Sequence, residues 1–245
     1  ESNIPDFRSE DGIFQARMNY GYSPEYMLSH EFFMEHTAEF YDYYKNQMIY
    51  KDAKPNPAHL ALAHLEQAGK LKAVITQNID GLHQLAGSRE VLELHGSVHR
   101  NYCIKCRKTY NLQYIIESRE IPKCDVCDGI VRPDVVLYNE MLDEDTMNKA
   151  VNYIYHADML IVGGTSLAVY PAAGLIDYYK GNNDNATYKF LSCRIPSFYF
   201  VAFAKRAADG ASRDIGFVLV FLLGRHQAAG FLNALFKFFL LGVPV

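Results

Sequence analysis

Four short, mostly apolar runs of residues predict strands in this chain. They cover residues 73–76, 91–94, 135–138 and 159–162. Each run is only four residues long and is followed by polar or glycine residues, which is typical of a buried strand rather than of a helix. The pattern therefore predicts the central strands of a sheet.

Helix start signals separate these runs. Ser23-Pro24 and Asn56-Pro57 each place a capping side chain before a proline at the first helical position. They predict one helix that reaches about residue 47 and a second that ends near residue 68. Asp143 is expected to cap a third helix, and residues 170–179 form a fourth. This alternation favours an α/β fold with a mostly parallel sheet covered on both faces.

Polar and glycine-rich segments follow three of the expected strands directly. In parallel sheets, ligands bind beyond the carboxyl ends of the strands, so segments at that place are candidates for one shared site. The three segments are Gln77-Asn78-Ile79-Asp80, His95-Gly96 and Gly163-Gly164-Thr165-Ser166. Their common position predicts a single ligand site.

The composition is that of a soluble globular protein. Of the 245 residues, 49% are hydrophobic and 21% charged, and the formal net charge is −4. This charge gives no global reason to expect nucleic acid as the main partner. A local excess of basic residues surrounds the cysteines, and we interpret it as a solvated face, with no specific nucleic-acid partner.

Four of the five cysteines form two Cys-x-x-Cys pairs, Cys103/Cys106 and Cys124/Cys127, which are 17 residues apart. Each pair can hold one side of a tetrahedral ion, and this spacing suits a zinc ribbon. Four thiolates close the coordination shell, so we expect structural rather than catalytic Zn²⁺. Cys193 has no such partner, and its expected role is that of a small buried side chain. With no visible secretory signal, the reduced cysteines favour a cytoplasmic protein.

The end of the chain differs from the rest. Residues 216–224 and 228–245 are very apolar, but the first run is too short to span a bilayer and the second is borderline. A membrane segment is therefore an unfavoured alternative for the tail. A buried helix and a tail foreign to the fold are the other two.

Several motifs follow one another along the chain. They are Ile4-Pro5-Asp6-Phe7-Arg8-Ser9, Thr76-Gln77-Asn78-Ile79-Asp80-Gly81-Leu82-His83, Leu94-His95-Gly96-Ser97, the two cysteine pairs, Arg132-Pro133-Asp134-Val135-Val136 and Gly164-Thr165-Ser166-Leu167. In this order they resemble the bacterial type of the sirtuins, NAD-dependent protein-lysine deacylases, from Glu1 to about Gly181. The resemblance implies a Rossmann-like NAD-binding domain (1–98 and 133–181), an inserted zinc-ribbon module (99–132) and an atypical tail (182–245).

The resemblance also implies a reaction. The acyl group of an acyl-lysine protein or peptide is transferred to ADP-ribose, nicotinamide is released, and NAD is consumed as a co-substrate. His95 is then the expected general base, a role that suits an imidazole near neutral pH. Asn78 and Asp80 are the other expected catalytic residues.

The remaining site residues follow from the same resemblance. The residues expected to contact NAD are Asp6, Phe7, Arg8, Gln77, Asn78, Ile79, Asp80, Gly164, Thr165 and Ser166. Val135 and Val136 match the segment that pairs with the substrate peptide by strand addition, and Val169 is expected to support the same groove. For Asp80-Gly81 a plain turn is the simpler alternative, and His59 and His64 are expected on a helix surface.

Four departures from the family pattern stand out. The glycine-rich turn that wraps the NAD phosphates in the family precedes the matching segment and is absent here, so weakened phosphate binding is expected unless the chain is a fragment. No family motif follows Gly181, which suggests an altered reading frame or a fused tail. Asn139 replaces a usual glycine. Tyr44 stands where an arginine marks dicarboxyl-lysine deacylases, which predicts neutral acyl substrates such as acetyl.

Two alternatives to an active deacylase remain open on the sequence. One is a catalytically dead sirtuin fragment that keeps only its fold. The other is a non-catalytic zinc-ribbon interaction module, which has no need of His95 or of the Gln77–Asp80 cluster. Binding of NAD distinguishes the deacylase from both.

Overall fold

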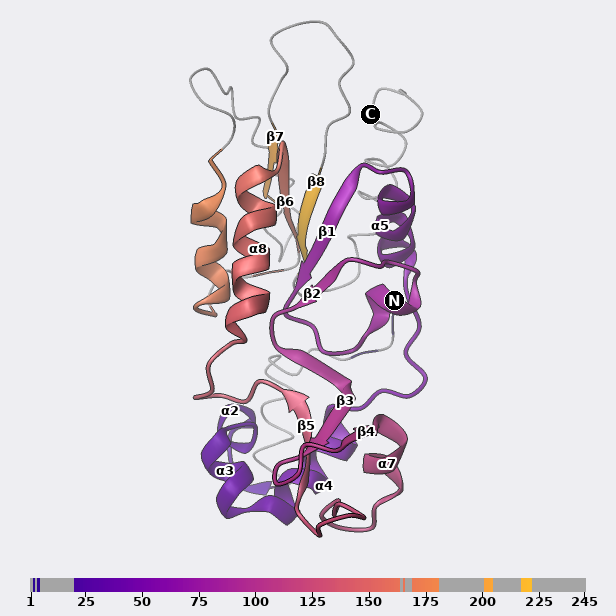
Figure 1. The fold of residues 1–245 in the computed structure, drawn as a ribbon, viewed down its shortest axis with the longest axis vertical. Coiled ribbons are helices and arrows are strands. Elements are labelled where there is room, and N and C mark those ends of the chain that lie inside the picture. Colours follow the sequence, from indigo (N-terminus) through magenta and orange to yellow (C-terminus); the bar gives the residue numbers. More distant parts are fainter. Residues whose placement is uncertain are drawn as a thin grey trace, which may run out of the picture.

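A computed structural model gives the fold of the chain (Figure 1). It describes residues 2, 4, 20–163, 165 and 169–180, together with the strand backbones at 201–204 and 217–221. The predictions for Asp6, Phe7, Arg8, Gly164, Ser166 and Cys193 lie outside the described residues, as does most of the tail.

The helices among these residues are α2 (Pro24–Met27), α3 (His30–Glu35), α4 (Thr37–Gln47), α5 (Pro57–Gln67), α6 (Leu82–Leu85), α7 (Leu112–Glu117), α8 (Glu144–His156) and the 3₁₀-helix η1 (Ala172–Tyr178). The strands are β1 (Leu71–Thr76), β2 (Val91–Glu93), β3 (Gly96–Cys103), β4 (Thr109–Asn111), β5 (Val131–Val135), β6 (Met159–Gly163), β7 (Val201–Ala204) and β8 (Phe217–Phe221).

The larger sheet has the strand order β2-β1-β8-β6-β7. Its first four strands are parallel, and β7 is antiparallel to β6. Thr76 at the end of β1 and Gly163 at the end of β6 both pair with Phe221 of β8, so these two strands end at the same edge. The predicted mostly parallel sheet is confirmed.

Helices cover this sheet on two sides. In Figure 1, α8 and η1 lie on one side of the strands and α5 on the other. On the first side Ile154 and Leu175 pack with Ile75, Leu160 and Val162 in one buried cluster. Each fully buried side chain of this size contributes roughly 1.5–3 kcal/mol, which is what holds the helices to the sheet.

A second unit lies at the opposite end of the molecule (Figure 1). Its small antiparallel sheet has the order β4-β3-β5 and packs with α2, α3, α4 and α7. The core is aromatic: Phe33 and Phe40 meet edge-on at 5.0 Å between ring centroids, and Phe40 stacks on Tyr44 at 5.6 Å. Residues from α3 and α4 thus share a core with Val131 of the ribbon region. The domain boundaries given above remain a prediction.

The predicted helix starts are confirmed by their caps. The Ser23 hydroxyl accepts from the Tyr26 N–H, the Asn56 side chain accepts from the Ala58 N–H, and Asp143 accepts from the Thr146 N–H. The first helix differs from its prediction because Ser29 caps a new helix and His36 breaks it again, which gives three pieces. The fourth expected helix is the 3₁₀-helix η1.

The predicted strand over residues 135–138 is wrong. The strand is β5, which begins at Val131 and ends at Val135. Beyond it the backbone turns, because the Glu140 carboxylate accepts from the Leu137 N–H at 2.9 Å and Asn139 has a left-handed φ of 71°. Pro133 is compatible with β5 because only one side of this edge strand is paired among the described strands.

The tail contributes two strands to the larger sheet. β8 lies between β1 and β6, and β7 closes the edge beside β6. That residues 182–245 are foreign to this fold remains a prediction. None of the described helices is long and apolar enough to cross a bilayer.

The prediction for His64 is confirmed, since it is exposed on α5, but the one for His59 is wrong. His59 is 9% exposed and His83, on α6, is 2% exposed, and their ring centroids are 4.7 Å apart. Burial lowers the pKa of His59 to about 4 and that of His83 to about 3, the latter with a smaller contribution from His59. The folded protein therefore holds two neutral imidazoles where α5 meets α6.

This pair predicts a loss of stability in acid. An unfolded histidine has a pKa of about 6.5. Below that pH both imidazoles therefore bind protons in the unfolded chain but not in the folded protein. The contribution of the pair is complete above about pH 6.5 and falls as the pH drops toward the folded-state pKa values. We expect His83→Gln to reduce the drop in unfolding free energy between about pH 7 and pH 4.5 by about 2 kcal/mol, measured by urea denaturation.

The matched control is His64→Gln, which removes an exposed imidazole from α5. An equal drop in the wild type and in His83→Gln would contradict the burial argument.

Candidate active site and metal site

Two of the polar segments predicted to share a site are directly bonded. The His95 Nδ1 atom lies 3.1 Å from the Gln77 carbonyl oxygen, and the Leu94 N–H donates to the Thr76 carbonyl at 2.8 Å. A carbonyl oxygen can only accept, so Nδ1 carries the hydrogen in this contact. The Nε2 atom of neutral His95 then has the lone pair that accepts a proton.

The segment around Val135 and Val136, which is expected to pair with the substrate peptide, contacts the backbone of His95. The Val136 N–H donates to the His95 carbonyl oxygen at 3.0 Å, while Gly96 pairs with Val135 across β3 and β5. Gly96 has a φ of 76°, and a Cβ atom there would lie 1.9 Å from the Asp134 carbonyl oxygen. Only glycine allows the two backbones to approach this closely.

The turn after β1 is fixed by its own side chains. The Thr76 hydroxyl accepts from the Asn78 N–H at 3.0 Å, and the Asp80 carboxylate accepts from the Leu82 N–H at 2.9 Å. The second bond is the turn chemistry that Asp-Gly predicts. Burial raises the pKa of Asp80, and the Leu82 N–H partly offsets that rise. Ile79 is half-buried and packs against the aromatic core of the second unit.

The segment after β6 begins at the same sheet edge. Because β8 alone separates β1 from β6, Thr76 and Gly163 are about 10 Å apart, two strand spacings. Thr165 is half-buried there, whereas Gly164 and Ser166 lie outside the described residues. Val169 is half-buried, and its carbonyl accepts from the Ala173 N–H at the start of η1.

A half-buried ion pair shapes the loop beyond Val136. Arg132 donates to both carboxylate oxygens of Glu140, at 2.8 and 2.9 Å, and His30 Nδ1 lies 2.8 Å from the same group. Burial favours a raised pKa for Glu140, but the bonds from Arg132, the Leu137 N–H and His30 outweigh it and lower the pKa to about 2. Glu140 is therefore a fully ionised anchor for this loop.

Asn139 is explained by the same loop. Its φ of 71° is a conformation that glycine adopts freely and that asparagine tolerates better than most residues. The departure from glycine at this position therefore requires no change of backbone.

Sequence reasoning missed several polar residues around the site. His99 Nε2 lies 2.9 Å from the Asp80 carbonyl oxygen, and Arg100 contacts both Glu93 and Asp134. The sequence marks Arg100 and Arg132 only as members of the basic excess around the cysteines, and Arg132 also as part of a motif. No spacing signal indicates their contacts, because their partners come from distant parts of the chain.

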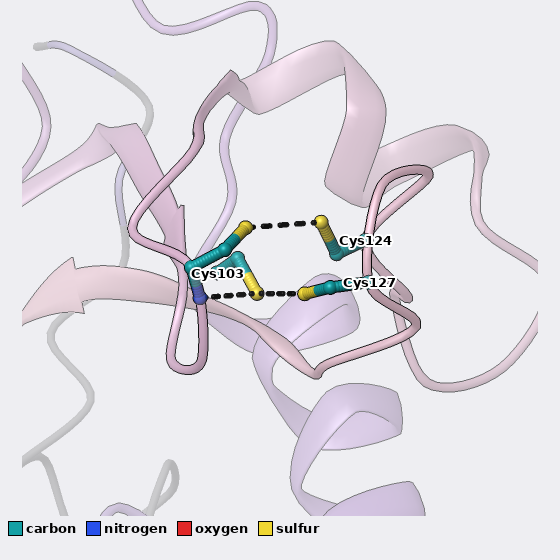
Figure 2. A group of neighbouring side chains, drawn as sticks. Cys103, Cys124 and Cys127 are labelled. Carbon is teal, nitrogen blue, oxygen red and sulfur yellow. Dashed lines mark hydrogen bonds between the residues drawn. The ribbon is translucent and has the colours of Figure 1, made fainter.

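The four paired cysteines lie close together in the second unit. Their sulfur atoms all lie within 4.8 Å of one another, with Cys103 and Cys127 at 3.4 Å and Cys106 and Cys124 at 3.5 Å. Figure 2 shows the sulfurs of Cys103, Cys124 and Cys127 turned toward one another from two facing loops. Zinc with bonds of about 2.3 Å to four thiolates would separate them by roughly 3.8 Å, so the four residues fit a Zn²⁺ ion.

The surroundings of the sulfurs also suit thiolates. The Lys105 N–H lies 3.4 Å from the Cys103 sulfur, and the Val126 N–H lies 3.4 Å from that of Cys124. The Tyr110 hydroxyl donates to Cys124 at 3.1 Å. A Cβ atom on Gly129 would lie 2.8 Å from the Cys103 sulfur, so the loop closes tightly on the cluster. These donors stabilise negative sulfur and orient the ligands.

The chain is similar to one known family and to proteins with an assigned function. The model of the Sir2 family matches residues 1–171. A protein named NAD-dependent protein deacetylase from Clostridium tetani is 67% identical over 183 residues, which are 74% of each chain. The protein of the same name from Staphylococcus aureus (strain N315) is 47% identical over 182 residues, again 74% of each chain.

Solved structures give the same picture. One described as "The Structural basis of Sirtuin Substrate Affinity" is 42% identical, with a TM-score of 0.65 over 74% of each chain. Another, described as "Sir2-p53 peptide-NAD+", is 31% identical, with a TM-score of 0.69 over 99% of this chain and 89% of that one. With 42% and 31% identity, both proteins are similar to this chain in sequence as well as in fold.

The metal site predicts that Cys124→Ser lowers both zinc content and stability. Structural zinc at four thiolates contributes on the order of 10 kcal/mol to folding, so losing one ligand is expected to lower the melting temperature by about 10 °C or more. Zinc released by a colorimetric chelator and thermal unfolding followed by circular dichroism measure the two effects. Cys193→Ser, outside both pairs, is the control. Full zinc content in Cys124→Ser would contradict the assignment.

Proposed function

Because this chain belongs to the Sir2 family, we propose that the residues around His95 form the active site of an NAD-dependent protein deacetylase. Removal of acyl groups from protein lysines at the expense of NAD is the function of the chain. This reading is favoured over a zinc-ribbon module, because the family similarity covers residues 1–171, on both sides of the ribbon.

The observation that carries the assignment is the bonding around His95. Its Nδ1 atom contacts the Gln77 carbonyl, and its own carbonyl accepts from the Val136 N–H. The segment proposed to hold NAD and the segment proposed to hold the peptide therefore each lie one hydrogen bond from His95, the first from its side chain and the second from its backbone. Acyl transfer requires a base close to both substrates.

When bound, NAD would supply two things: the ribose carbon to which the acyl-lysine oxygen bonds, and the nicotinamide that leaves that carbon. In our proposal His95 accepts a proton at Nε2 from a ribose hydroxyl, and the Gln77 carbonyl keeps the ring in that tautomer. The acyl group ends on ADP-ribose, which makes the reaction a group transfer as well as a deacylation.

The neighbouring residues orient NAD in this proposal. The Asn78 and Asp80 side chains fix the nicotinamide ribose and carboxamide, with Gln77 at the ribose and Ile79 lining the nicotinamide pocket. The residues proposed for the ribose and phosphates and for the covering loop are Gly164, Thr165, Ser166, Asp6, Phe7 and Arg8.

The acyl-lysine peptide is proposed to add as a strand beside Val135 and Val136. One side of β5 is unpaired among the described strands, so β5 is an edge strand, as strand addition requires. Val169 is proposed to support the peptide from the loop after β6.

We also propose a cytoplasmic location. Four thiols arranged for zinc persist in a reducing compartment, and the similar proteins named above are bacterial deacetylases.

His95→Ala tests the catalytic proposal. Loss of a general base typically costs about 10²–10⁴-fold, so we expect nicotinamide release with an acetyl-lysine peptide to fall by that factor. NAD binding, measured by calorimetry, is expected to change only a few-fold, because His95 acts on a proton rather than on the phosphates. His156→Ala, on the exposed face of α8, is the control. Wild-type turnover in His95→Ala would remove the base from the mechanism.

The acyl preference is a separate prediction. Tyr44 is fully buried and stacked on Phe40, and no cation occupies its position to pair with an acyl carboxylate. We expect the enzyme to remove acetyl from a peptide at least about tenfold faster than succinyl, because an unpaired charge is costly to desolvate. Rates on two peptides that differ only in the acyl group measure this. Faster removal of succinyl would contradict it.

A further inference from the structure

A cavity of about 680 Å³ lies beside the end of β5. Val135 and Val136, the residues proposed to pair with the substrate peptide, line it together with charged side chains from four other segments. An added strand points its side chains alternately to the two faces of the sheet. The residues that flank the acyl-lysine therefore reach the charged groups of this cavity.

The cavity contains more carboxylates than guanidinium groups. The carboxylates are Glu93, Asp134, Glu140 and Asp143, and the guanidinium groups are Arg100 and Arg132. Arg132 and Glu140 neutralise each other, since Arg132 binds both oxygens of that carboxylate. This pair leaves no charge for a ligand.

Arg100, in contrast, is shared by two acids. Its Nη1 atom lies 2.5 Å from Glu93 and its Nε atom 2.8 Å from Asp134. The Glu93 side chain is only 6% exposed, whereas that of Asp134 is 44% exposed. One guanidinium cannot neutralise two carboxylates, so the excess negative charge remains on the side that faces solvent, at Asp134.

Asp143 adds a second exposed carboxylate. It caps α8 through the Thr146 N–H, and its side chain is exposed at the cavity wall. Among the described residues no arginine or lysine forms an ion pair with it, although Lys149 of the same helix attracts it over a longer distance. The cavity is therefore negative, with its least compensated charge at Asp134 and Asp143.

We propose that Asp134 and Asp143 are specificity-determining residues that select acyl-lysines flanked by arginine or lysine. The inference rests on the proposed function of the cleft and names its substrate class. Because an acylated lysine is itself neutral, discrimination by charge has to come from its neighbours in the peptide. Exposed pairs of this kind contribute about 0.2–1 kcal/mol each, so the preference is graded rather than absolute.

Three acetyl-lysine peptides test the proposal, identical except that the flanking residues are arginine, alanine or glutamate. We expect kcat/KM to be about tenfold higher for the arginine peptide than for the glutamate peptide. The double variant Asp134→Asn/Asp143→Asn should reduce this ratio to about twofold or less. Asparagine keeps the helix cap at Asp143, so the fold is preserved. Asp145→Asn, an exposed acid of α8 that does not line the cavity, should keep the wild-type ratio.

Binding of fluorescent versions of the same peptides, with and without about 0.5 M salt, separates this inference from the proposed function. A wild type that releases no nicotinamide with any peptide overturns the function, while tighter binding of the arginine peptide that salt weakens still supports the selectivity. Equal binding of the arginine and glutamate peptides, a preference for glutamate, or an unchanged ratio in the double variant overturns the selectivity.

Discussion

The site depends on one backbone crossing, where the start of β3 touches the end of β5. There the Val136 N–H donates to the His95 carbonyl, and Gly96 leaves no room for a side chain against the Asp134 carbonyl. The same residue, His95, is tied to the turn after β1 through Gln77. Three segments far apart in the sequence are thus held by short contacts, and a single Cβ atom on Gly96 would separate β3 from β5. Gly96 is therefore required by the geometry of the proposed site.

Much of this arrangement could be predicted from local patterns. The caps at Ser23, Asn56 and Asp143 were visible because a side chain bonds within three residues of itself. The two cysteine pairs were visible because their spacing is a metal-ligand signature. Strand ends followed by polar turns indicated where Gln77 and His95 lie. Each of these signals depends only on a few neighbouring residues in the sequence.

What the sequence could not show are the contacts made at long range. Glu140 receives donors from Arg132 and from His30, which is 110 residues away, and this network ends β5 earlier than the apolar pattern predicted. His59 was assigned to the helix surface because nothing nearby in the sequence shows that α6 covers it. Periodicity gives the face of a helix only when its partner is also known.

The zinc site and the catalytic cleft are joined by the same two strands. β3 runs from Gly96 beside His95 to Cys103 at the metal cluster, and β5 returns from Val131 to Val135. Cys103 and Val131 are paired at one end of this ladder, as Gly96 and Val135 are at the other. A metal that fixes the loops at Cys103 and Cys127 therefore fixes the register in which β5 reaches His95. If His95 acts as proposed, the ribbon influences the reaction through this register without contacting the reacting atoms.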